Sequence, residues 1–262
     1  MKINTLMSGS WGNAIYVESN KCKVLIDAGQ TGKCLIKALE EGCRIRPDEL
    51  DAIFITHAHR DHVCGAGVLS RKYDLPLFAT EGTWTEMSAL IGPIASHNIN
   101  YIGVEDAVEI KDLVMESFPL SHDALEPVGY RCSSGGKSIG IATDSGVFTT
   151  KMSQALHNVY CLVLEANYDL EMLNKGPYPW HLKRRIASVN GHLSNEGAGQ
   201  ALLRIKGEAT KEVILAHLSE ENNSPNLARQ TVEGILKAHQ ATPEDLNISV
   251  APRYRPGRIR RI

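Results

Sequence analysis

The sequence of 262 residues has no apolar run that approaches the ~20 residues needed to cross a bilayer. Its start, Met1 to Leu6, also lacks the long apolar segment and the small-residue cleavage site of a signal peptide. We therefore expect a cytoplasmic protein with no membrane partner.

The chain has six cysteines, and no two of them have C-x-x-C spacing. This spacing does not support a zinc ribbon or a thioredoxin-like site. It favours free thiols in a reducing compartment. Cys64 follows His62 by two residues, so an approach of its thiol to a metal stays open as an alternative.

The chain also lacks a strong charge of either sign, because its net charge is −2. This gives no overall attraction for nucleic acid, but the basic residues are clustered. The tail over 253–262 holds five arginines and no acidic residue, and Lys183, Arg184 and Arg185 form a second cluster. Both clusters could bind phosphates, or they could be solvated charge on a helix face and on a frayed tail.

We find no linker and no internal repeat, and the hydrophobic fraction of 43% is near the globular average. The chain is therefore expected to form one domain over 1–262. Strands are predicted at 14–17, 23–26, 52–56, 77–80, 114–118, 128–132, 138–142, 159–164 and 213–216. Helices are predicted at about 31–41, 65–73, 82–90, 180–188, 194–205 and 225–238. Strands dominate the first half and alternate with helices in both halves, which indicates an α/β protein with sheets between helix layers.

The most informative segment is the hexapeptide His57-Ala58-His59-Arg60-Asp61-His62. It places three imidazoles and a carboxylate directly after the apolar run 51–56, which is rich in β-branched and aromatic residues and typical of a strand. Imidazole nitrogens and carboxylate oxygens are ligands that zinc, manganese and iron favour. Four such groups at the end of a strand could hold two metal ions.

Other candidate ligands follow predicted strands in the same way. His122, Asp144 and His217 each come directly or closely after an apolar strand, and Asp27 follows the run Val24-Leu25-Ile26. Because the carboxyl ends of strands form the crevice in which α/β proteins bind ligands, these side chains can converge.

H-x-H-x-D-H after a buried strand, followed by a lone His, an Asp and a final His at strand ends, resembles the metallo-β-lactamase superfamily. The resemblance implies a four-layer αββα sandwich. It also implies two divalent metal ions, zinc or manganese, with iron as the alternative. One would be bound by His57, His59 and His122 and the other by Asp61, His62 and His217, with Asp144 bridging them. It further implies that Asp27 orients a ligand, and Asp123 could hold the tautomer of His122.

Segments 164–169, 176–185, 191–195 and 216–223 resemble the YycJ/WalJ branch of this superfamily. That resemblance implies a phosphodiesterase, namely a 5′-to-3′ exonuclease on double-stranded DNA that uses a hydroxide held between two metals. Two departures from the branch pattern occur. Trp11 interrupts the glycine-rich motif Ser8-Gly9-Ser10 and Gly12-Asn13, which could reshape the rim of the site. Tyr168 stands where some relatives have histidine.

Three residues are expected to carry the chemistry. Asp61 could orient the attacking hydroxide, and His192 backed by Glu165 could give a proton to the leaving 3′-oxygen, as in the related tRNA-processing endonucleases. Alternatively, Glu165 and His192 are structural and cap the next helix. DNA contacts are expected from Trp180 with Lys183, Arg184 and Arg185, and from Ser10 and Asn13. A core-facing Trp180 with solvated arginines is the alternative.

Two other functions remain open at this point. The same site could hydrolyse a small ester, a thioester, a lactam or a cyclic phosphodiester. The chain could also be a non-catalytic binding partner in a signalling complex, although a complete metal-ligand set argues against that.

Overall fold

A computed structural model describes residues 1–205, 207–241 and 246–262. Its framework is two seven-stranded sheets. The first has the strand order β14-β1-β2-β3-β4-β5-β6 and the second the order β13-β12-β11-β10-β9-β8-β7. The first sheet consists of β1 (Lys2–Met7), β2 (Ala14–Glu18), β3 (Lys23–Ile26), β4 (Ala52–Phe54), β5 (Leu77–Ala79), β6 (Ile99–Tyr101) and β14 (Arg260–Arg261). The second consists of β7 (Ala107–Ile110), β8 (Leu113–Pro119), β9 (Val128–Ser134), β10 (Lys137–Ala142), β11 (Cys161–Glu165), β12 (Glu212–Ala216) and β13 (Asn247–Val250).

Each sheet has an antiparallel half and a parallel half. The pairs from β14 to β3 are antiparallel, and those from β3 to β6 are parallel. The pairs from β7 to β10 are antiparallel, and those from β10 to β13 are parallel. The parallel strands read as continuous buried runs, such as Cys161–Glu165, because both of their faces are covered.

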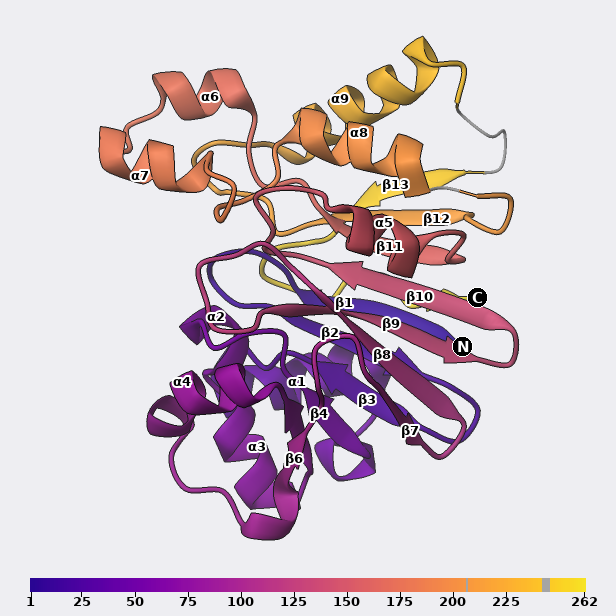
Figure 1. The fold of residues 1–262 in the computed structure, drawn as a ribbon. Coiled ribbons are helices and arrows are strands. Elements are labelled where there is room, and N and C mark those ends of the chain that lie inside the picture. The colour runs from indigo at the N-terminus through magenta and orange to yellow at the C-terminus, as the bar shows by residue number, and fades with distance from the viewer. Residues whose placement is uncertain (206, 242–245) are drawn as a thin grey trace.

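Helices cover the outer face of each sheet (Figure 1). The first sheet is covered by α1 (Gly32–Cys43), α3 (Ala66–Tyr73) and α4 (Glu81–Ile91), with the short α2 (Arg60–Val63) beside them and the 3-10 turns Pro47–Glu49 and Ser96–Asn98 between elements. The second sheet is covered by α5 (Thr150–Leu156), α8 (Asn195–Ile205) and α9 (Pro225–Ala238). The pair α6 (Leu170–Lys175) and α7 (Trp180–Ile186) projects from one end.

The core is correspondingly layered. One buried apolar cluster joins the first sheet to α1, α3 and α4, a second fills the space between the sheets, and a third joins the second sheet to α5, α8 and α9. Phe54 and Tyr130 meet between the sheets with ring centroids 5.5 Å apart. Helix, sheet, sheet and helix therefore form the four-layer αββα sandwich that the sequence predicted.

The predicted strands and helices all occur, with ends shifted by a few residues. The structure adds β1, α2, β6, β7, α5, α6, β13 and β14. The alternative of a frayed basic tail is wrong. The tail pairs β14 with β1, and Arg260 Nε lies 3.0 Å from Glu212 Oε2.

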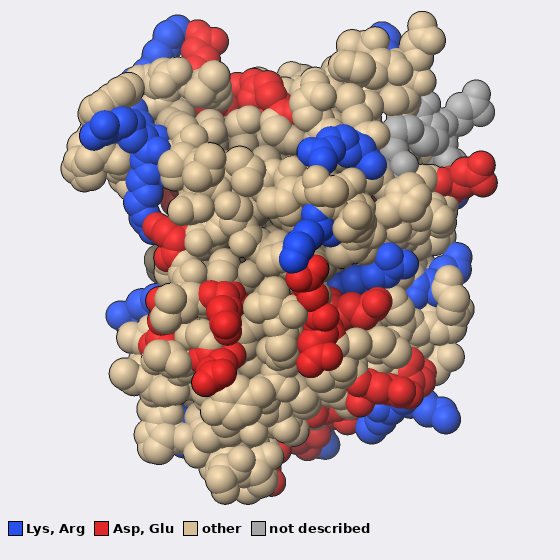
Figure 2. All heavy atoms as spheres, in the orientation of Figure 1, with Lys and Arg blue, Asp and Glu red and all other residues tan. Residues whose placement is uncertain are grey.

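No helix within the described ranges is both long and apolar enough to span a bilayer. The face in Figure 2 carries acidic side chains across its middle, and basic ones mark the α6–α7 projection. A hollow of about 490 Å³ is lined by acidic Glu105, Asp106 and Glu116 together with Arg131 and Lys151. None of the predicted metal ligands lines it, so this large hollow is not the predicted site.

Candidate metal centre

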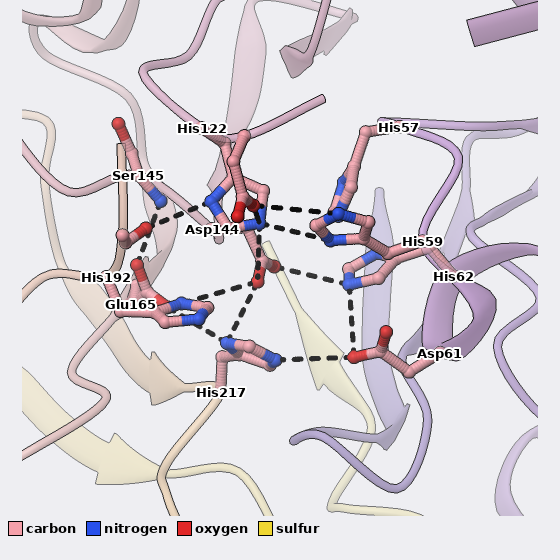
Figure 3. A network of polar contacts seen from close by, with 12 residues as sticks. His57, His59, Asp61, His62, His122, Asp144, Ser145, Glu165, His192 and His217 are labelled. Carbon is pink, nitrogen blue, oxygen red and sulfur yellow. Dashed lines mark hydrogen bonds and ion pairs between the residues drawn. The ribbon is translucent and has the colours of Figure 1, made fainter. Parts of the chain in front are cut away.

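The seven predicted ligands come together at the ends of strands from both sheets (Figure 3). His57, His59, Asp61 and His62 lie in the loop after β4 and in α2, at the edge of the first sheet. His122, Asp144 and His217 follow β8, β10 and β12 of the second sheet. The site therefore lies at the seam where the two sheets meet.

The side chains form overlapping groups. His57, His59 and His122 offer nitrogen atoms that all lie within 4.8 Å of one another, and the distance from His122 Nε2 to His59 Nδ1 is 3.2 Å. Asp61, His62 and His217 form a second such group. In that group, Asp61 Oδ2 lies 3.7 Å from Nε2 of both histidines.

Asp144 stands between these two groups. Its Oδ2 lies 3.3 Å from His62 Nε2, and its Oδ1 lies 3.9 Å from His122 Nε2 and 3.2 Å from His217 Nδ1. A carboxylate that reaches both groups is placed where a bridging ligand would be needed.

Unpartnered buried atoms test whether this set fits metal ions. His57 Nε2, Asp144 Oδ2 and His217 Nε2 are buried and have no hydrogen-bond partner in the part of the chain that the structure describes. Buried polar atoms are rarely left unpaired unless something else binds them. Nitrogen and carboxylate donors of this kind suit zinc, manganese or iron. The superfamily pattern and these donors together indicate divalent metal ions.

The electrostatics of the site agree with this reading. Burial, followed by the charge of His62, holds the pKa of His57 well below its usual value, so its ring is neutral and can donate a lone pair. Burial alone would also lower the pKa of His217. The carboxylates of Asp144, Asp61 and Glu165 outweigh it and raise that pKa to about 10. The buried carboxylates thus favour positive charge at this place, which protonated His62 and His217 supply here and which bound cations would supply in their stead.

The backbone at three site residues is held in a sparsely populated conformation. Asp27, Asp144 and His217 have φ values of 60°, 64° and 55°, in the left-handed region that non-glycine residues seldom adopt. Surrounding structure must hold these residues in place. For His217, the hydroxyl of Ser8 accepts a hydrogen bond from the backbone N–H at 2.7 Å. Such strain is commonly found at functional sites.

The ligands are oriented by a shell of hydrogen bonds. Asp27 Oδ2 lies 2.7 Å from His62 Nδ1, and Asp27 also accepts from the backbone N–H and the hydroxyl of Thr56. The carbonyl of Gly191 contacts His122 Nδ1 at 3.0 Å. Asp123 lies instead near Nε2 of His122, at 3.4 Å, and accepts from Arg185 Nε at 2.6 Å. The Nδ1 contact that selects the tautomer of His122 thus comes from Gly191 and not from Asp123.

Glu165 and His192 lie together as predicted. Glu165 Oε1 is 2.8 Å from His192 Nδ1 and 2.9 Å from His217 Nδ1, while its Oε2 accepts from the backbone N–H of Ser145 and Leu193. Burial would raise the pKa of Glu165, but His192 and the other donors lower it to about 2. Glu165 is therefore an ionised carboxylate that orients two imidazoles.

Sequence reasoning missed several of these supports. Thr56, Ser8, Ser145 and Gly191 act through a hydroxyl or the backbone, and those groups leave no motif in a sequence. Proximity in sequence to a predicted ligand was the signal available, and it applied to Thr56, which precedes His57, and to Ser145, which follows Asp144. Cys64 belongs to none of the possible metal-binding groups found among the described residues, and it lines a separate hollow with Leu90.

The predicted substrate-binding residues divide into those near the centre and those on the projection. Asn13 is buried, and its Nδ2 lies 3.0 Å from His62 Nε2 and 3.4 Å from Asp61 Oδ2. Ser10 is exposed on the same loop. On α7, Trp180 is 66% exposed with the Arg184 guanidinium 6.0 Å from its ring centroid, so the alternative of a core-facing Trp180 is wrong. Lys183 Nζ donates to the Asn174 carbonyl.

Comparison with known proteins agrees with this geometry. The family model described as "Beta-lactamase superfamily domain" matches residues 23–218. The chain belongs to the metallo-β-lactamase superfamily, in its YycJ/WalJ branch. It is therefore a metallo-hydrolase.

Three relatives show the extent of the likeness. The protein named Exodeoxyribonuclease WalJ from Streptococcus pneumoniae is 41% identical over 95% of this chain and 91% of its own length. Exodeoxyribonuclease YycJ from Bacillus anthracis is 40% identical over 90% of this chain and 89% of its own. Among solved structures, the metallo-β-lactamase fold protein YhfI from Bacillus subtilis is 15% identical, with a TM-score of 0.73 and coverage of 98% of both chains, and shows the shared fold.

Proposed function

We propose that this superfamily member is a nuclease, and more specifically an exonuclease that degrades double-stranded DNA in the 5′-to-3′ direction with two divalent metal ions. The observation that carries the proposal is the convergence of seven donor side chains. Three of them, His57, Asp144 and His217, have a buried Nε2 or Oδ2 atom that lacks a hydrogen-bond partner among the described residues. Two relatives that match almost the whole chain are named exodeoxyribonucleases, which supports DNA as the substrate.

His57, His59 and His122 would hold one metal and Asp61, His62 and His217 the other, with Asp144 between them. When bound, two divalent cations offset the charge of a phosphodiester and lower the pKa of water to about 7. Asp61 is the ligand with the most exposed side chain in the second group, at 25%, so it can also orient the attacking water.

His192 is suited to protonate the leaving 3′-oxygen. Its Nδ1 is fixed by Glu165 at 2.8 Å, which leaves Nε2 to face the substrate, and its side chain keeps 19% of its surface exposed. The ionised Glu165 stabilises the protonated imidazole that must form before the transfer. Exposed Trp180 and Arg184 on α7 add an aromatic surface and a cation for the DNA backbone.

The decisive experiment is digestion of a 5′-phosphorylated DNA duplex that is labelled at either the 5′ or the 3′ end. We expect wild-type protein to release mononucleotides from the 5′ end in manganese or zinc and to lose activity after chelation. Asp144→Ala and His57→Ala should each reduce the rate by at least ~10³-fold, because each removes a metal ligand. Asp48→Asn, at an exposed position in the 3-10 turn Pro47–Glu49, is the control that should retain activity.

Full activity of Asp144→Ala protein would contradict the proposal. Hydrolysis of small esters or cyclic phosphodiesters without any DNA cleavage would assign the site to another substrate. Less than one metal per chain, with no activity gained on adding manganese or zinc, would favour a non-catalytic binding role.

A further inference from the structure

Two exposed aromatic side chains lie side by side on loops that also support the metal centre. Trp11 and Tyr254 are 63% and 55% exposed, and their ring centroids are 6.0 Å apart at an interplanar angle of 83°. They line a hollow of about 320 Å³ together with Gln30, Cys34, Lys37 and Arg255. The metal-centre chemistry described above uses none of these residues.

Both rings are tied to metal-ligand loops. Trp11 is two residues from Asn13, whose Nδ2 lies 3.0 Å from His62 Nε2, and two residues span at most ~7 Å. On the other side, Tyr254 follows Arg253, whose guanidinium donates to the carbonyl of Leu218 at 3.1 Å. Leu218 is the neighbour of the predicted ligand His217. Trp11 and Tyr254 are therefore each linked, through the chain or through one hydrogen bond, to a loop that carries or contacts a predicted metal ligand.

The loop that carries Trp11 is firmly positioned. The N–H of Gly12 donates to the Gly9 carbonyl at 2.8 Å, and Gln30 Nε2 donates to the carbonyl of Trp11 at 2.5 Å. A Cβ at Gly12 would come within 2.7 Å of the Gly29 carbonyl oxygen, so the close approach of the two loops requires glycine there. The loop thus holds the Trp11 side chain exposed to solvent, although a Trp side chain can bury roughly 150–250 Å² of surface.

The chemistry of the hollow fits a nucleotide. Perpendicular rings form a corner in which a base parallel to one ring meets the other ring edge-on, an arrangement that aromatic groups favour. Arg255 is exposed, and within the described ranges no ion-pair partner is found for it, so its charge is available to a phosphate. Lys37 and Glu41 also line the hollow, and Lys37 Nζ lies 3.7 Å from Glu41 Oε1, so these two charges offset each other and Arg255 supplies the net positive charge.

We propose that Trp11 and Tyr254 form a stacking subsite for an unpaired nucleobase of the DNA substrate, with Arg255 facing its phosphate. This inference rests on the proposed nuclease function and adds to it. It also gives a role to the tryptophan that interrupts the glycine-rich motif of the branch. An enzyme that removes terminal nucleotides must separate the end of a duplex, and stacking on aromatic side chains stabilises a base that has left its pair.

The test is fluorescence anisotropy of a labelled DNA duplex with a short unpaired 5′ end, measured without added metal so that binding is separated from cleavage. Trp11→Ala and Tyr254→Ala should each weaken binding by ~10-fold, the effect of losing one base–aromatic stack. Trp11→Phe should retain most of the affinity. Tyr101→Ala is the matched control, because Tyr101 is also 63% exposed but lies on the edge strand β6.

An abasic probe makes the assignment specific. Removal of the unpaired base should weaken wild-type binding by a similar factor and should not weaken Trp11→Ala binding further. Wild-type affinity in Trp11→Ala and Tyr254→Ala would overturn the subsite even if DNA is cleaved. Binding that follows these expectations without any cleavage would instead refute the proposed function and leave the subsite standing.

Cys34 allows a second test with the unmutated hollow. It is exposed and lines the hollow, so a bulky maleimide on its thiol should weaken DNA binding. Cys34→Ser protein treated in the same way should bind as untreated protein does. Equal loss of binding in both proteins, or none in either, would count against the subsite.

Discussion

At the scale of single residues, Asp27 shows how a side chain that touches no substrate can govern the centre. Its carboxylate accepts from Thr56 and lies 2.7 Å from His62 Nδ1, and its own backbone has a φ of 60°. The carboxylate thereby directs Nε2 of His62 toward Asp144 and Asp61.

We expect Asp27→Asn to lower metal affinity by ~10- to 100-fold, as is typical when a partner of a metal-bound histidine is lost. The physical reason is that an amide can no longer stabilise the His62 tautomer as the carboxylate does. Competition with a chromogenic chelator measures the effect. Asp51→Asn is a matched control, since Asp51 pairs with Lys111 outside the centre. Equal affinity of Asp27→Asn and wild-type protein would contradict this role.

At this scale, the sequence predicted the metal ligands of the candidate site but not the backbone contacts that orient them. Metal ligands are drawn from a few residue types, so the hexapeptide 57–62 and the histidines after strands could be recognised from the sequence. Contacts made by backbone atoms, such as the Gly191 carbonyl on His122, depend on tertiary placement and cannot be read from residue type.

At the scale of elements, strands and helices were missed when they were too short to show a period or when buried polar residues interrupted it. The helix α6 has six residues, too few to display a 3.6-residue period. In β1, Asn4 and Thr5 are buried and interrupt the apolar pattern, and Asn4 is accommodated because its Nδ2 donates to the Gly42 carbonyl at 2.9 Å. By contrast, α9 begins at Pro225 behind the N-cap Ser224 and ends at Ala238, the same residues that its pattern predicted.

The α6–α7 projection yields a prediction at the same scale. It packs through its own small cluster of Tyr168, Leu173 and Ile186, and it exposes Trp180 beside Arg184. If α7 contacts DNA phosphates, Arg184→Gln should reduce the slope of log affinity against log salt by about one, because one fewer counterion is released.

Binding titrations between low and high salt measure that slope. Lys21→Gln is the control, since Lys21 is exposed in the turn between β2 and β3, at the far end of these strands from Asn13 and Asp27. An unchanged slope for Arg184→Gln would remove α7 from the DNA-binding surface.

At the scale of the whole molecule, the layered core predicts a loss of stability in alkali. Burial raises the pKa of Cys22, Cys43 and Cys161 to about 12, whereas an unfolded thiol has a pKa of about 8.5. At pH values between these two pKa values, the thiols of the unfolded chain lose their protons whereas those of the folded chain keep them. The free energy of unfolding should therefore be unaffected by these thiols below about pH 8.5 and should fall as the pH rises toward 12.

Urea unfolding of metal-free protein at a series of pH values between 8 and 11, roughly the window in which these thiols differ, measures this dependence. Cys161→Ala should make it shallower, whereas Cys34→Ser should not change it, because Cys34 is exposed. A dependence that is equally steep in Cys161→Ala protein would show that other groups cause the loss.

The division of ligands between the sheets has a consequence for how the protein matures. Four of the seven donors precede residue 63, but the last is His217, which follows the third of four parallel strands of the second sheet. A growing chain on the ribosome therefore carries only an incomplete set until residue 217 has been made and both halves have docked. If the proposed function is correct, a nascent or truncated chain that lacks His217 is expected to have no hydrolytic activity, and activity is expected only once the full set of donors is assembled.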